Sequence, residues 1–166
     1  MSVVEDLKAA FAGESQANRK YLAFAKKAEQ EGFPQVARLF RAAAEAETVH
    51  AHAHLRAMDG IKGTRDNLKE AMAGETYEYE EMYPPFLEGA QKSGNKQAEN
   101  SFKNAMSVEK THARLYAEAL TAVEAGKDLP AGAFHVCEVC GHTVAGDAPD
   151  RCPVCGARRE RFSAVN

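Results

Sequence analysis

Hydrophobic residues recur at helical spacing through the first 124 positions of the chain, and breakers divide them into four segments. Gly- and Pro-containing turns lie near residues 32–34, 59–65, 93–95 and 125–126, so we expect helices over about 3–30, 34–58, 66–93 and 96–124. Ser2 and Glu5 form a capping-box pattern at the first helix. Short connections make successive helices antiparallel, which predicts a mainly α fold built on a four-helix bundle.

Two local features qualify this prediction. Pro84 and Pro85 lie within the third segment, where consecutive prolines should kink or break the helix. After the Gly- and Pro-rich residues 126–132, the composition changes to Cys, Gly and Pro. A tail this short cannot build an apolar core of its own, so it needs a cross-link such as a bound metal. We expect a bundle with its linker over residues 1–130 and a metal-stapled domain over residues 131–166.

Charge and composition exclude several classes of protein. The net charge is −3 without a basic run, which argues against a nucleic-acid binder. No apolar run approaches the roughly 20 residues of a membrane span. The acidic start lacks the apolar region of a secretory signal, so we expect a cytoplasmic protein. All four cysteines follow residue 136, in two CxxC pairs. That pattern indicates metal binding rather than disulfides.

The motif Glu-x-x-His occurs twice, at Glu47–His50 and at Glu109–His112. Residues three apart on a helix are neighbours, so each motif presents a carboxylate and an imidazole together. One motif alone is weak support for a metal site, because glutamate and histidine are ordinary residues of helices. Its repetition predicts two similar helical hairpins that pack together.

A Gly-Glu pair precedes each motif at nearly the same distance. Glu14 lies 33 residues before Glu47, and Glu75 lies 34 residues before Glu109. One Glu from each of two helices plus Glu-x-x-His from each of the other two is the ligand set of di-iron and di-manganese carboxylate bundles. Glu78 falls on the face of Glu75, whereas Glu81 points elsewhere and is expected in solvent.

The predicted inward set holds five carboxylates and two imidazoles: Glu14, Glu47, His50, Glu75, Glu78, Glu109 and His112. The alternative is that they cover solvated helix faces, which is the usual place for glutamate. Buried carboxylates need partners or metals, and two cations would neutralise about four charges. Oxygen-rich donors with some nitrogen suit iron or manganese.

Two tyrosines lie on the same helix faces as these glutamates. Tyr21 follows Glu14 by seven residues, and Tyr83 follows Glu75 by eight. Simple packing and a hydrogen bond to a ligand or to a metal-bound oxygen species remain equally open for both.

The tail contains two CxxCG sequences, Cys137–Gly141 and Cys152–Gly156. Each turn directs two thiolates at one tetrahedral metal, and the glycine permits the tight backbone turn. Zinc and iron are both compatible with the four thiolates Cys137, Cys140, Cys152 and Cys155.

Together these motifs resemble the rubrerythrin family over nearly the whole chain. GES, ETVH, GETYE with MYP, and EKTH are similar to its di-iron motifs, and CxxCG with CPVCG resembles its rubredoxin-like module. The resemblance implies a ferritin-like bundle in which the seven inward residues bind two irons, bridged by Glu47 and Glu109. It implies one iron at the four cysteines, with zinc possible as isolated, and it matches Tyr21 and Tyr83 to tyrosines near the di-iron pocket. Pro85 departs from the family, where a single proline is expected.

The resemblance also implies a function. A non-haem peroxidase would reduce hydrogen peroxide to water in oxidative-stress defence. Its electrons would come through the rubredoxin-like iron from rubredoxin or an NAD(P)H-dependent reductase. One alternative is a ferroxidase that handles iron in a ferritin-like shell, and another is a zinc-stapled interaction module on a structural bundle.

The expected partners include a second copy of the chain. Glu109 lies about 16 residues before the end of its helix, roughly 25 Å from the linker along the axis. Unless the tail folds back, its cysteine site lies at least as far from the bundle site as the linker does. That separation is long for electron transfer during turnover, so we expect a head-to-tail homodimer, or a higher homo-oligomer, in which each tail serves another chain's bundle.

Overall fold

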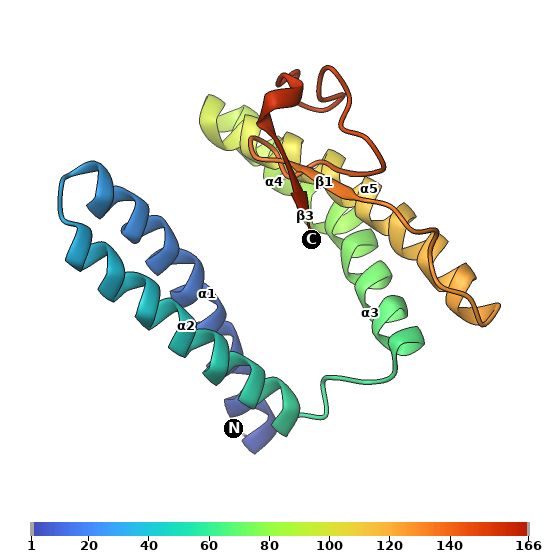
Figure 1. Ribbon diagram of the computed structural model, residues 1–166, viewed down its shortest axis with the longest axis horizontal. Coiled ribbons are helices and arrows are strands. Elements are labelled where there is room, and N and C mark those ends of the chain that lie inside the picture. Colours follow the sequence, from blue (N-terminus) through green and yellow to red (C-terminus); the bar gives the residue numbers. More distant parts are fainter. Residues whose placement is uncertain (1, 166) are drawn as a thin grey trace. The chain divides into compact units, whose positions relative to one another are not determined.

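The computed structural model describes residues 2–165 and comprises two compact units, Met1–Lys62 and Gly63–Asn166. Helices dominate both units, and a small sheet module follows the last long helix (Figure 1). The predicted mainly α class with a small four-cysteine module is confirmed. Within the described residues, no helix is both long and apolar enough to cross a membrane.

The first unit is a hairpin of α1 (Val3–Gln30) and α2 (Pro34–Ala57). The predicted capping box is confirmed: the Glu5 amide donates to Ser2 Oγ at 3.3 Å, and the Ser2 amide donates to a Glu5 carboxylate oxygen at 2.6 Å. Pro34 occupies the first turn of α2, where its missing amide proton costs nothing.

Small side chains form the contact between α1 and α2. Ala25, Ala28 and Ala37 make up the buried cluster, and Phe40 packs against it. Asn18 is the buried polar residue of this interface. Its amide nitrogen donates to the Ala44 carbonyl at 2.7 Å, which ties the two helices together near the polar residues described below.

The second unit begins with α3 (Thr64–Tyr77), a π-helical turn η1 (Glu78–Met82) and α4 (Tyr83–Ser93). α5 (Lys96–Glu124) packs against all three of these elements. The Asn95 side chain caps α5 by accepting the Ala98 amide proton at 3.1 Å.

The interruption expected at the two prolines takes the form of the π-helical turn η1. The Tyr83 amide donates to the Glu78 carbonyl, five residues back rather than four. A π-helical turn holds one more residue than an α-helical turn, so it shifts all later side chains around the helix. Pro84 and Pro85 then fall in the first turn of α4, where proline is tolerated.

The two units repeat one aromatic cluster. Tyr21, Phe24 and Phe40 have ring centroids 5.6–6.4 Å apart. The residues 62 positions later are Tyr83, Phe86 and Phe102, at 5.7–6.3 Å.

Glu14 and Glu75, by contrast, are 61 positions apart. The second repeat therefore has one extra residue between Glu75 and Tyr83. The π-helical turn lies within this interval, so we infer that it absorbs the insertion.

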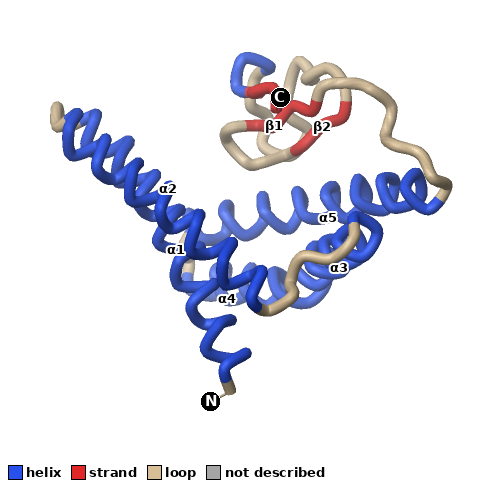
Figure 2. Tube along the Cα trace, turned by 60° about the horizontal axis from the view of Figure 1, so that its bottom comes forward, coloured by secondary structure: helices blue, strands red, loops and turns tan. Residues whose placement is uncertain are grey.

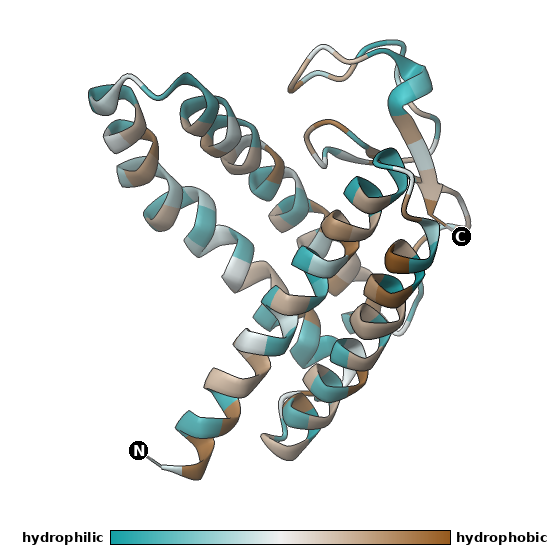
Figure 3. Cartoon of the chain, turned by 90° about the vertical axis from the view of Figure 1, so that its left-hand side faces the viewer, coloured by the Kyte–Doolittle hydropathy of each residue, from teal (hydrophilic) through white to brown (hydrophobic). Residues whose placement is uncertain are grey.

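The tail forms a three-stranded antiparallel sheet of β1 (Phe134–Cys137), β2 (Thr143–Ala145) and β3 (Phe162–Val165), in the order β2-β1-β3 (Figure 2). The 3-10 turn η2 (Arg159–Arg161) leads into β3. Figure 3 shows apolar and polar positions alternating along the helices, as the sequence pattern predicted.

The π-helical turn generates a testable prediction. Deleting the exposed Glu81 restores the seven-residue spacing of the first repeat, but it forces Pro84 and Pro85 into an α-helical register. We expect this deletion to lower the free energy of unfolding by about 3 kcal/mol, because proline in a helix interior loses a hydrogen bond and clashes. Chemical denaturation followed by circular dichroism measures the change.

A second variant is the matched control. Combining the deletion with Pro84→Leu and Pro85→Ala copies Leu22 and Ala23 of the first repeat. This combination should recover most of the lost stability. Unchanged stability after the deletion alone would contradict the link between the π-helical turn and the prolines.

Candidate metal centres

The first unit gathers three of the predicted residues into one cluster. Glu14 on α1 and Glu47 and His50 on α2 each place a ligand atom within 4.8 Å of the others. His50 Nδ1 lies 3.0 Å from a Glu47 carboxylate oxygen, as the i, i+3 spacing predicts. We call this cluster the first half-site.

The second unit contains the corresponding cluster of Glu75 on α3 with Glu109 and His112 on α5. His112 Nδ1 lies 2.8 Å from a Glu109 oxygen and 3.8 Å from a Glu75 oxygen. Burial and the Glu109 charge raise the pKa of Glu75, although His112 opposes the shift. We call this cluster the second half-site.

Glu78 lies near the second half-site without belonging to the 4.8 Å cluster. Burial and the neighbouring Glu75 charge raise its pKa, and His112 lowers it. Its position at the start of the π-helical turn is where a helix departs from regular hydrogen bonding, which is common at functional sites. Glu81 is exposed, as expected.

The same carboxylates shift the pKa values of two tyrosines, Tyr83 and Tyr116. Burial and the charges of Glu78, Glu109 and Glu75 raise the pKa of Tyr83. Burial and the charges of Glu75 and Glu109 raise the pKa of Tyr116. Tyr21 packs its ring against two phenylalanines in the first unit. A role for Tyr21 and Tyr83 in catalysis therefore stays a prediction.

The donor sets of the half-sites fit metal ions. Each cluster brings two carboxylates and an imidazole nitrogen together, and like charges this close are unfavourable without a cation. Mixed carboxylate and imidazole donors are those that first-row metals such as iron accept. In both clusters it is Nδ1 of the histidine that faces the carboxylates, so the same ring nitrogen is available to a metal each time.

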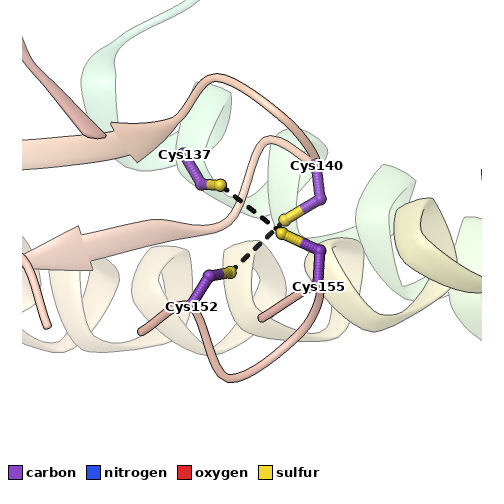
Figure 4. Close-up of side chains that lie close together, drawn as sticks. All are labelled: Cys137, Cys140, Cys152 and Cys155. Carbon is purple, nitrogen blue, oxygen red and sulfur yellow. Dashed lines mark hydrogen bonds between the residues drawn. The ribbon is translucent and has the colours of Figure 1, made fainter. Parts of the chain in front are cut away.

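The four cysteines converge from the two knuckles of the tail (Figure 4). Cys137 and Cys155 have sulfur atoms 3.7 Å apart, and those of Cys140 and Cys152 are 3.5 Å apart. Sulfur atoms bound at about 2.3 Å to one tetrahedral metal would be roughly 3.8 Å apart. All four thiols are free of disulfides, so the site fits one metal ion.

The protein environment shifts the pKa values of Cys140 and Cys152 in opposite directions. Burial raises the pKa of Cys140 well above its ordinary value. Burial also opposes ionisation of Cys152, but the amide protons of Cys155 and Val154 outweigh it and lower the pKa of that thiol. Knuckle amides that point at sulfur stabilise thiolate, the form that binds metal.

The tail folds back onto α5 beside the second half-site. Thr143 Oγ1 on β2 lies 2.8 Å from His112 Nε2. A methyl group at Gly141 would contact Val108 at 3.8 Å. The pKa of His142 is lowered by burial and then by the neighbouring His112 and Arg114 of α5. The tail thus folds back, which is the condition under which the sequence analysis allowed the cysteine site to lie closer to Glu109.

Sequence reasoning missed two residues of this region. Tyr116 lies four residues after His112 on α5, so helical spacing alone could have identified it. Thr143 carries no comparable signal, because its contact with His112 exists only after the tail folds back.

Comparison with known proteins identifies the family. The rubrerythrin family model matches residues 5–120, and the model of the rubrerythrin rubredoxin-like domain matches residues 135–163. Rubrerythrin-2 of Clostridium acetobutylicum is 35% identical, over 95% of this chain and 94% of its own. Nigerythrin of Nitratidesulfovibrio vulgaris is 36% identical, over 98% of this chain and 86% of its own.

Solved structures give the same result. Nigerythrin in its fully reduced, all-ferrous state superposes with a TM-score of 0.58 and 35% identity, covering 99% of this chain and 87% of that one. With the donor sets above, these matches confirm the predicted cofactors, iron at a carboxylate–histidine di-iron site and iron at a four-cysteine site. This chain therefore belongs to the rubrerythrin family.

Proposed function

We propose that this chain is a peroxidase that reduces hydrogen peroxide to two water molecules, consuming two electrons and two protons, in oxidative-stress defence. The observation that carries the proposal is the pairing of two site types. A carboxylate–histidine half-site recurs in both units, and a four-cysteine site packs against α5 beside one of them. Family membership supports an oxidoreductase of this kind.

In this proposal the chain provides a ferritin-like bundle whose ligands would hold two iron ions, and these ions would supply the two electrons. The family resemblance implies that Glu47 and Glu109 would hold both ions, and five residues would complete the ligand set: Glu14, His50, Glu75, Glu78 and His112. The domain division follows, with the bundle and linker over residues 1–130 and the iron module over residues 131–166. The separate family matches to residues 5–120 and 135–163 support that division.

The two tyrosines beside the second half-site keep their hydroxyl protons. The raised pKa of Tyr83 and of Tyr116 keeps both phenols protonated at neutral pH, so each hydroxyl remains a hydrogen-bond donor. A donor of this kind can orient an oxygen of the substrate. Tyr21 is assigned the corresponding role in the first repeat because Tyr21 and Tyr83 occupy equivalent places in the repeated aromatic cluster.

The four-cysteine site is the proposed entry point for electrons from rubredoxin or an NAD(P)H-dependent reductase in the cytoplasm. A one-electron site of this kind favours a peroxidase over the alternative of ferroxidase and iron storage, which does not require one. We retain a homodimer as the proposed assembly, on the prior that closed two-fold dimers are the commonest oligomers.

Removal of either site should separate electron supply from peroxide chemistry. Glu109→Ala should reduce peroxide oxidation of the ferrous protein in a single turnover by more than about a hundredfold, because it removes a ligand of the second half-site. Cys137→Ser with Cys152→Ser should retain most of that single turnover once the half-sites are saturated with ferrous ion, and it should abolish steady-state turnover with a reductase. Stopped-flow absorbance and NADH consumption measure the two steps.

Glu118→Gln on α5 is the matched control, because Glu118 is exposed and pairs only with Arg114 among the ion pairs described. It should leave both rates unchanged. Full steady-state turnover in the double cysteine variant would refute electron entry through the tail.

Glu78 generates a second prediction, which concerns the redox state. Ferric iron is harder than ferrous iron and favours carboxylate over imidazole. Among the described residues, no hydrogen bond fixes the second ring nitrogen of His50, whereas Thr143 contacts that of His112. We expect His50 to bind one ion in the reduced protein and Glu78 to replace it in the oxidised protein.

Crystal structures in both redox states test this exchange. Glu78→Gln should retain His50 as a ligand in both states and slow turnover by about tenfold or more. Identical ligation of that ion in the two wild-type states would show that Glu78 does not take part.

A further inference from the structure

Thr143 connects the second half-site to the four-cysteine module of the same chain. Its Oγ1 lies 2.8 Å from His112 Nε2 and 3.2 Å from the Gly141 carbonyl oxygen. Gly141 directly follows Cys140 in the first knuckle. One hydroxyl group therefore lies between a histidine of the bundle and the backbone of the cysteine site.

A neutral histidine that binds a metal through Nδ1 carries its proton on Nε2, and this sets the direction of the contact with Thr143. A threonine hydroxyl has one proton to donate, and the carbonyl of Gly141 can only accept. Thr143 Oγ1 must then accept from His112 Nε2–H. In a neutral imidazole the other nitrogen, Nδ1, is left with its lone pair.

The lone pair that results faces the carboxylates. His112 Nδ1 lies 2.8 Å from Glu109 and 3.8 Å from Glu75, too close for an unprotonated nitrogen and two carboxylates to coexist comfortably without a cation. The same tautomer is the one that binds metal through Nδ1. Histidine ligands typically donate their second N–H to a fixed acceptor, which sets the ring orientation.

Packing around the contact holds the hydroxyl in place. Thr143 pairs with Val136 in the β2–β1 ladder. Gly141 has a positive φ of 83° and approaches the buried Val108 of α5. Both the backbone at Gly141 and the Thr143 hydroxyl thus hold the module against α5.

We propose that Thr143 is a positioning residue, through which the cysteine module of this chain holds its own His112 in the metal-binding tautomer. This inference rests on the proposed di-iron site and deepens it. It assigns the module a second task besides electron entry, which is to preorganise the half-site on its own α5. Among the described residues of the first unit, none is hydrogen-bonded to the second ring nitrogen of His50, so the two half-sites differ in how firmly the histidine is held.

Proton-detected nitrogen-15 NMR of the full-length protein loaded with diamagnetic zinc tests the tautomer directly. The wild-type protein should show a His112 Nε2–H proton that exchanges slowly with water. Thr143→Val, which has the same shape without the hydroxyl, should lose this protection and weaken ferrous-ion binding at the second half-site by about tenfold. Thr143→Ser should restore both properties.

Thr121→Val is the matched control, because the Thr121 hydroxyl lies on the exposed side of α5 and donates to the Ala117 carbonyl. It should change neither property. A wild-type His112 protonated at Nδ1 alone, or a Thr143→Val protein with unaltered Nε2–H protection, would overturn the proposal. The wild-type measurement needs no substitution and no enzymatic activity, so absence of peroxidase activity would refute the proposed function and leave this test intact.

Discussion

Repulsion between carboxylates gathered on helix faces is the constraint on which the rest of the structure depends. Glu75 and Glu109 come from different helices and meet beside His112, and burial together with the Glu109 charge raises the pKa of Glu75. Such a cluster costs free energy unless a cation neutralises it. The helices accordingly place a histidine nitrogen in each half-site, and small residues such as Ala25, Ala28 and Ala37 let α1 and α2 approach closely.

The second repeat is one residue longer than the first, and it carries an additional carboxylate, Glu78, in the same region. The aromatic clusters and the Glu-x-x-His motifs recur at an interval of 62 positions, but Glu14 and Glu75 are 61 apart. The π-helical turn at Glu78–Met82 lies where the extra residue enters, and it begins with the carboxylate that the first repeat lacks. Pro84 and Pro85 mark its end, because proline suits the start of the α-helix that follows.

Local patterns were sufficient to predict the helices, the capping box at Ser2, the two half-sites and the four-cysteine cluster. These features depend on spacing within one helix or one knuckle, which a sequence displays directly. The π-helical form of the interruption was not foreseen, because prolines predict a break without specifying its hydrogen bonding. The contact between Thr143 and His112 was also missed, and the sequence left open whether the tail folds back. Both depend on how the linker turns, and its Gly- and Pro-rich sequence permits many paths.

The stability of the metal-free and iron-loaded protein tests most directly whether the half-sites are built for cations. In the metal-free protein, Glu75→Gln should raise the melting temperature by about 3 °C, because it removes a charge that Glu109 opposes. Iron should stabilise the wild-type protein strongly and this variant little, and Glu81→Gln, at an exposed carboxylate nearby, should behave as wild type in both states. A Glu75→Gln protein that melts at a lower temperature without metal, yet gains as much from iron as the wild type, would contradict the account.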